Sequence, residues 1–245
     1  MLVSYATWCV PLGFLPHTLA IALRWNETGR FPYWGNYEVF GAYAWAIILF
    51  LLIFQALKPN LKIIGVFVLP FAFMMIGIAI MSSEEGREIP RTYFTYWLGI
   101  HVLFAKLSYS SVLISAVLAT SYLMVTRGKI VDMAYPLLAK LPGPERIDFY
   151  SYRFAAFAFV MLGAMIASGS VWAYKAWGRY WGWDPIETWA FVSWLVYGLY
   201  LHLRSTMGWQ GKKASWLNIF AFALVIFSFF GIPFFYPSAH EHLKY

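Results

Sequence analysis

The chain has 245 residues, of which 61% are hydrophobic and 12% are charged, and its mean hydropathy is +0.62. Soluble globular proteins carry about 25% charged residues, so this composition excludes a soluble enzyme or binding domain and indicates an integral membrane protein in a lipid bilayer. The net charge of +7 arises in short loops between apolar runs, which does not favour nucleic acid as a partner. The single cysteine, Cys9, excludes disulfide frameworks and Cys-rich metal sites within the chain.

Apolar runs bounded by charge, Pro or Gly predict an all-α polytopic fold with about seven transmembrane helices, because roughly 20 helical residues cross the hydrocarbon core. These runs are 8–24, 39–57, 62–81, 94–125, 153–174, 187–207 and 215–236. We expect one membrane domain over residues 1–245. If the N-terminus is inside, the loops on the inner side carry more Lys and Arg than the other loops. The positive-inside rule therefore predicts an inside N-terminus, and seven helices then place the C-terminus outside.

The stretch WGRYWGWDPIETW (Trp177–Trp189) concentrates aromatic rings and charge. We expect it to lie on the outer side, within residues 175–189, which we call the tryptophan-rich segment. One interpretation is an aromatic belt at the membrane interface, with Asp184 and Glu187 capping a helix that begins near Pro185. The other is a rigid aromatic platform, broad enough to stack on a porphyrin.

Four histidines lie at two predicted depths. His17 lies near the middle of the first predicted helix and His202 in the inner half of the sixth, while His101 lies near the outer end of the fourth and His240 follows the seventh. Ionisable residues inside membrane spans are costly and indicate function, and an axial imidazole pair from different helices commonly holds haem iron. The alternative is that each histidine bonds a neighbouring hydroxyl or carbonyl. Zinc is disfavoured, because neither a thiolate cluster nor an HExxH spacing is present.

The tryptophan-rich segment resembles the WWD signature of the haem-handling proteins of cytochrome c maturation. Its DPIET ending is similar to the CcsA/ResC branch, the system II cytochrome c synthetase. Three other stretches resemble the family's early transmembrane His, its outer-His helix and its second transmembrane His. They are HTLAIALRWNETGRFPYWGNYEVF (His17–Phe40), WLGIHVLFAKLSYSSVLISA (Trp97–Ala116) and YGLYLHLR (Tyr197–Arg204).

The resemblance implies a path for haem b as substrate. His17 and His202 would receive haem within the membrane, and His101 and His240 would ligate its iron at the external site. The residues that would shape this site are Trp177, Trp181, Trp183 and Asp184.

Two positions depart from the family pattern. The C-terminus reads SAHEHLKY, so His242 competes with His240 as the ligand. Ile186 stands where the family often has Lys, which leaves Arg179 or Lys175 to hold a propionate, and we favour Arg179 because its planar fork matches a carboxylate.

The implied activity is that of a haem lyase. The protein would present reduced haem to the CxxCH motif of an exported apocytochrome c, with a CcsB/ResB-like membrane subunit, in a bacterial plasma membrane or a thylakoid-type membrane. A dihaem b-type electron-transfer subunit is an alternative, although it needs no aromatic platform. A haem exporter without lyase activity is another, and it would share every site residue.

Overall fold

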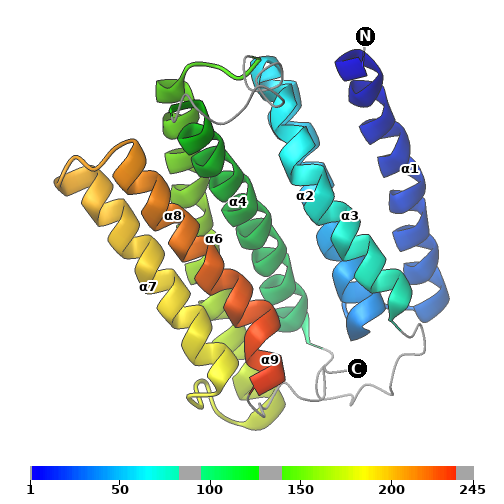
Figure 1. Cartoon of the computed structure of the whole chain (residues 1–245). Helices are drawn as coiled ribbons and strands as arrows, with labels where there is room; N and C mark the ends of the chain where they lie inside the picture. The colour runs from blue at the N-terminus through cyan, green and yellow to red at the C-terminus, as the bar shows by residue number, and fades with distance from the viewer. Residues whose placement is uncertain (1, 83–94, 127–139, 236–245) are drawn as a thin grey trace. The chain divides into compact units, whose positions relative to one another are not determined.

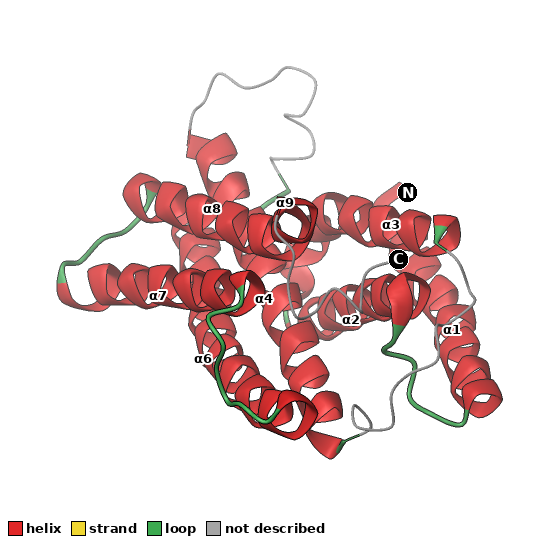
Figure 2. Cartoon of the chain, turned by 90° about the horizontal axis from the view of Figure 1, so that it is seen from below, coloured by secondary structure: helices red, strands yellow, loops and turns green. Residues whose placement is uncertain are grey.

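A computed structural model describes residues 2–82, 95–126 and 140–235, with backbone alone at 2–8, 233 and 234. In these ranges the regular secondary structure is entirely helical (Figure 1), and loops join the helices (Figure 2). The predicted ligands His240 and His242 lie outside the described residues. Each of the seven predicted runs overlaps a helix.

The elements in chain order are α1 (Leu2–Thr28), α2 (Gly35–Leu57), the 3-10 helix η1 (Pro59–Ile64), α3 (Gly65–Met81), α4 (Tyr96–Thr126), α6 (Pro144–Trp177), α7 (Pro185–Thr206), α8 (Lys212–Ile226), the π-helix η3 (Phe227–Gly231) and α9 (Ile232–Phe235). Within the described residues, five helical stretches are long and apolar enough to cross a membrane. They are Gly35–Leu57, Pro59–Met81, Tyr96–Thr126, Pro144–Trp177 and Lys212–Gly231. The all-α membrane fold is therefore confirmed, whereas α1 and α7 are not among these five. The count of seven spans and the orientation stay predictions.

Helix α6 begins at Pro144, nine residues before the predicted start at 153. The extra turns are polar, but they are amphipathic: Ile147 is fully buried and Asp148 is paired with Arg204. Pro144 suits a first helical turn, where no N–H is needed. Hydropathy marks where a helix leaves apolar surroundings, and here the hydrogen-bonded helix continues beyond that point.

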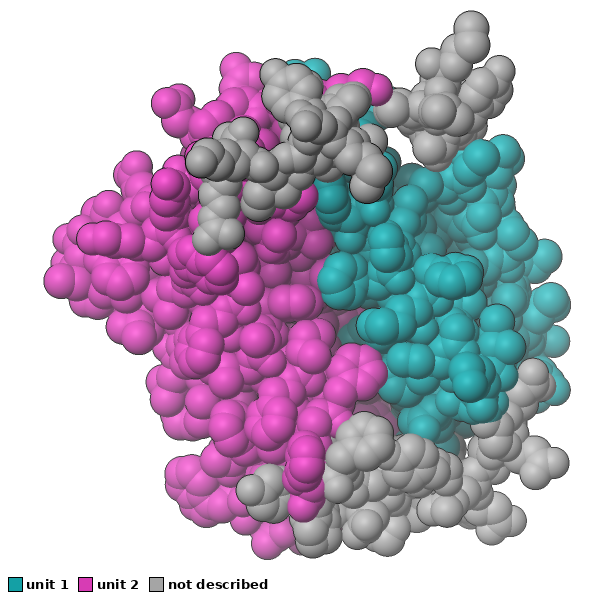
Figure 3. Space-filling view, viewed as in Figure 1, with its two compact units in different colours: residues 1–88, 245 teal, residues 89–244 magenta. Residues whose placement is uncertain are grey.

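The chain forms two compact units, which Figure 3 colours separately. Unit 1 comprises residues 1–88 together with residue 245, and its helices are α1 to α3. Unit 2 comprises residues 89–244, with helices α4 to α9. The single membrane domain expected from the sequence stays a prediction.

In unit 2, α4 packs along α6 and α8, and α7 packs against α6 and α8 (Figure 1). A buried polar cluster joins three of these helices. Asn218 Nδ2 donates to Ser115 Oγ at 2.7 Å and to Ser151 Oγ at 2.9 Å. The hydroxyls of Ser115 and Ser151 each donate to the other residue's carbonyl, at 2.7 and 3.0 Å. Small residues let membrane helices approach closely, and such bonds fix their register, so this cluster sets the height of α4 against α6.

Candidate functional site

His101 is anchored by a backbone carbonyl of the neighbouring helix. Its Nδ1 lies 2.8 Å from the carbonyl oxygen of Met165 in α6. Because a carbonyl only accepts, this partner assigns the proton to Nδ1 and leaves Nε2 as the unprotonated nitrogen of a neutral imidazole. That tautomer, with the other nitrogen donating to a carbonyl, is the usual state of a metal-ligating histidine.

Two further residues of α6 complete the surroundings of this imidazole. A Cβ on Gly169 would lie 2.6 Å from His101 Nδ1, so only glycine admits the ring at this distance. The His101 ring is stacked on that of Trp172, with centroids 6.3 Å apart and planes 15° apart. Trp172 is 3% exposed. The ring is thus held at its edge and on one face.

Trp172 connects His101 to the tryptophan-rich segment. Its indole packs edge to face on Trp177, with centroids 4.9 Å apart. Trp177 is the last residue of α6, and Gly178, at φ +75°, ends the helix in the left-handed conformation that glycine favours. The structure therefore brings His101 and the start of the tryptophan-rich segment together, through a residue that the sequence analysis did not select.

The turn before α7 is fixed by its two carboxylates. Glu187 Oε2 accepts from the backbone N–H groups of Gly182, at 2.9 Å, and Asp184, at 3.2 Å. Asp184 Oδ1 accepts from Ile186 N at 2.9 Å, which completes a capping box. These contacts agree with the capping role among the sequence interpretations.

Trp183 lies in this turn with φ +55° and is 71% exposed. A bulky side chain at positive φ is strained, and such strain persists only where neighbouring contacts impose it. The two carboxylate contacts on either side of Trp183 supply that constraint. The turn therefore presents a large exposed indole in a fixed position.

Trp181 packs on this indole, and Arg179 lies over the neighbouring Gly182. The Trp181 ring packs edge to face on Trp183, with centroids 5.8 Å apart, and also contacts Phe191. Its Nε1 is buried and has no hydrogen-bond partner among the described residues, although buried indole N–H groups normally find an acceptor. The Arg179 guanidinium covers Gly182, where an added Cβ would lie 2.6 Å from Cζ. The turn therefore combines exposed aromatic surface with a cation, and a buried indole N–H with no partner in the described part of the chain lies beneath it.

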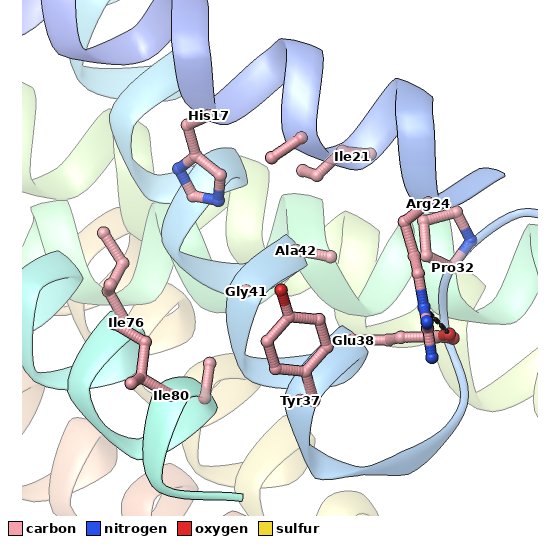
Figure 4. A pocket seen from close by; sticks show the side chains of 12 residues that line it. His17, Ile21, Arg24, Pro32, Tyr37, Glu38, Gly41, Ala42, Ile76 and Ile80 are labelled. Carbon is pink, nitrogen blue, oxygen red and sulfur yellow. Dashed lines mark hydrogen bonds and ion pairs between the residues drawn. The ribbon is translucent and has the colours of Figure 1, made fainter. Parts of the chain in front are cut away.

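His17 lines a pocket of about 150 Å³ within unit 1, formed by α1, α2 and α3 (Figure 4). The ring faces the backbone of Gly41, but its buried Nδ1 has no partner at hydrogen-bond distance among the described residues. Next to it, Trp45 Nε1 donates to Thr18 Oγ1 at 2.9 Å and fastens α1 to α2. Ligand pockets usually measure about 300–1,000 Å³, so this one accommodates only part of a large ligand.

The far end of the same pocket is charged. Glu38 accepts from Arg24 Nε at 3.1 Å, from Arg30 Nη1 at 2.6 Å and from the backbone N–H of Trp34 at 3.0 Å. The Glu38 side chain is 2% exposed. These contacts tie the end of α1, the following loop and the start of α2 into one rigid corner. In the sequence, this stretch stands out only through the family resemblance of residues 17–40.

His202 is exposed on α7, and its Nδ1 lies 3.4 Å from Thr206 Oγ1. Two residues further along, Arg204 Nη1 contacts both carboxylate oxygens of Asp148 at 2.8 Å. This ion pair fixes the end of α7 against α6. Because His202 belongs to unit 2 and His17 to unit 1, the predicted inner pair stays a prediction.

The capping box gives a prediction for Asp184. Asp184→Ala should lower the stability of the protein by about 1 kcal/mol, because the N-cap acceptor is lost, whereas Asp184→Asn should lie within about 0.5 kcal/mol of wild type, because Asn caps equally well. Thermal unfolding in detergent, followed by tryptophan fluorescence, measures both variants. Equal destabilisation by Asn and Ala would show that the charge, and not the cap, is what the site needs.

Comparison with known proteins identifies the family of this chain. The family model of cytochrome C assembly proteins matches residues 33–240. The cytochrome c biogenesis protein CcsA of Guillardia theta is 32% identical over 250 residues, covering 94% of this chain and 83% of the relative. The CcsA proteins of Prochlorococcus marinus (strain MIT 9301) and Parasynechococcus marenigrum (strain WH8102) are 32% and 30% identical, and the matches cover 92% and 91% of this chain and 80% and 81% of the relatives. The chain therefore belongs to the cytochrome C assembly family, among the CcsA-type cytochrome c biogenesis proteins.

Proposed function

We propose that this chain holds haem b as a substrate on the tryptophan-rich segment and presents it for covalent attachment to an apocytochrome c. His101 is one iron ligand, and His240, with His242 as the competing position, supplies the other. The observation that carries the proposal is the His101–Met165 hydrogen bond at 2.8 Å. It sets the imidazole in the tautomer that binds metal, and the ring lies beside Trp172, which in turn packs on Trp177.

The residues of the tryptophan-rich segment bind and orient the substrate. The indoles of Trp177, Trp181 and Trp183 offer faces and edges for packing on a porphyrin, and the constrained turn keeps Trp183 in place. Arg179 pairs with a propionate through its planar fork. Asp184 and Glu187 are committed to the backbone, which keeps their charge away from the propionates.

The chemistry of attachment belongs to the haem and the cytochrome. Haem, when bound, supplies two vinyl groups, to which the two cysteine thiols of a CxxCH motif add as thioethers. The contribution of this chain is orientation, which is worth several kcal/mol of barrier when two reactants are held in line. A histidine ligand that the histidine of CxxCH can displace also gives a route for release.

A second, inner site completes the proposal. His17 and His202 receive haem within the membrane before it reaches the tryptophan-rich segment. The buried, unpartnered Nδ1 of His17 and the pocket beside it support a ligand at this position. Because this chain supplies no large domain for the apocytochrome among its described residues, a CcsB/ResB-like membrane subunit is the proposed partner.

Co-expression with a CcsB-type partner and a CxxCH apocytochrome tests this function. Reduced pyridine-haem spectra should show covalent c-type haem on the cytochrome at least tenfold above a strain that lacks this chain. A cytochrome whose CxxCH cysteines are changed to alanine is the control and should carry none. Stable b-type haem on this chain with no covalent product would instead indicate a dihaem electron-transfer subunit, and haem outside the cell without product would indicate an exporter.

A further inference from the structure

We propose that Met165 and Gly169 of α6 form an imidazole-orienting groove, in which the Met165 carbonyl holds Nδ1 of His101 and the missing side chain at Gly169 leaves room for the ring. Both are positioning residues, because they act on haem only through His101. The inference rests on the proposed function, in which His101 ligates the haem iron.

The Met165 carbonyl serves several donors. In an α-helix it accepts the backbone N–H four residues on, which is that of Gly169. It also accepts from Ser168 Oγ at 3.1 Å, and that hydroxyl lies closer to the Ala164 carbonyl, at 2.6 Å. His101 Nδ1, at 2.8 Å, is therefore its shortest side-chain contact. A carbonyl oxygen has two lone pairs, so it can accept a side-chain donor in addition to the helical N–H. Such a donor reaches the oxygen only where no side chain of α6 covers it.

Gly169 provides that opening. An added Cβ would lie 2.6 Å from His101 Nδ1 and 2.8 Å from Cε1. Neither separation occurs between real atoms of these types, so one methyl group must push the ring off the carbonyl. Trp172 covers one face of the ring, and the height of α4 is fixed by the buried cluster around Ser115. We therefore expect the imidazole to yield by rotating, which turns Nε2 away from its ligating direction.

The carbonyl contact also tunes the ligand. A hydrogen bond from Nδ1 to a carbonyl increases the basicity of Nε2 and fixes the ring plane, and loss of such an outer contact typically costs 10- to 100-fold in metal affinity or activity. Gly169→Ala is therefore expected to lower haem bound at the tryptophan-rich segment at least tenfold. Millimolar imidazole should restore it, because a free imidazole is not tethered to α4 and can ligate the iron without entering the space of the added Cβ.

Gly99→Ala is the matched control. It makes the same change two residues from His101, at a position where an added Cβ meets nothing within 4 Å. Haem content should stay within twofold of wild type. The measurement is the reduced pyridine-haem spectrum of the purified protein, with its CcsB-type partner, in the absence and presence of imidazole.

A double variant separates positioning from packing. In His101→Gly with Gly169→Ala no tethered ring remains to be displaced, and a free imidazole can ligate the iron without entering the space of the added Cβ, so it should restore haem to within twofold of the level that it restores in His101→Gly alone. Failure of that rescue would show that residue 169 matters for helix packing, and would overturn the inference. Full haem in Gly169→Ala, together with loss in His101→Gly, would overturn it while leaving the proposed function intact. Full haem in His101→Gly would remove the proposed function itself.

Discussion

His101→Gly is expected to abolish c-type haem on the co-expressed cytochrome, with a loss of at least fiftyfold, and to lower haem on this chain at least tenfold. The reason is geometric. His101 is the described histidine that the structure places beside the tryptophan-rich segment, through Trp172 and Trp177, and its removal leaves iron without a ligand from α4. Exogenous imidazole fits the vacated space, because the Met165 carbonyl remains to orient it. Rescue of both haem and product is therefore the second half of the expected result.

Leu103→Gly provides the control for backbone flexibility. It introduces glycine into the same helix at an exposed position, where the cost is about 1 kcal/mol and the histidine is untouched. Haem and product should remain near wild type. A His101→Gly protein that keeps its full haem complement contradicts the assignment of His101 and would leave its contact with Met165 as a structural hydrogen bond.

Hydropathy alone predicted where α2 and α3 end. The predicted run 39–57 and α2 share their last residue, as do the run 62–81 and α3. In both cases the next residue is polar and forms the C-cap: Lys58 for α2 and Ser82 for α3. The carboxylate spacing before α7 was equally informative, because a capping box is local and its partners lie three residues apart.

The surroundings of His101 could not be predicted in the same way. Its partner is a backbone carbonyl 64 residues away, and every residue has a carbonyl, so no side-chain pattern marks Met165. Gly169 and Trp172 acquire meaning only once the register of α4 against α6 is known. The sequence nevertheless contained a signal. Gly169 and Trp172 are three residues apart and so share a helix face, and Trp172 precedes Trp177 by little more than one helical turn.

Hydropathy also could not predict the charged corner of unit 1 around Glu38. Arg24, Arg30 and Glu38 appear in the sequence as scattered charges at the ends of apolar runs. In the structure one carboxylate, almost fully buried, receives both guanidinium groups. Removing one member of a buried ion pair is costly, because the remaining charges lose their compensation. Arg24 and Glu38 also line the pocket that contains His17, so the corner forms part of the wall of that pocket.

Glu38→Gln is expected to lower the free energy of unfolding by about 2 to 3 kcal/mol, since two arginines, each partly screened by solvent, lose their shared carboxylate. For a chain of this length that corresponds to a fall in Tm of roughly 5 to 10 °C. Glu27→Gln is the matched control. Glu27 also pairs with Arg24, at 3.1 Å, but its side chain is 69% exposed, so its loss should cost at most about 1 kcal/mol. Thermal unfolding in detergent compares the two variants. Equal shifts in Tm would mean that burial of Glu38 confers no additional stability, and that the rigid corner beside His17 is held by other contacts.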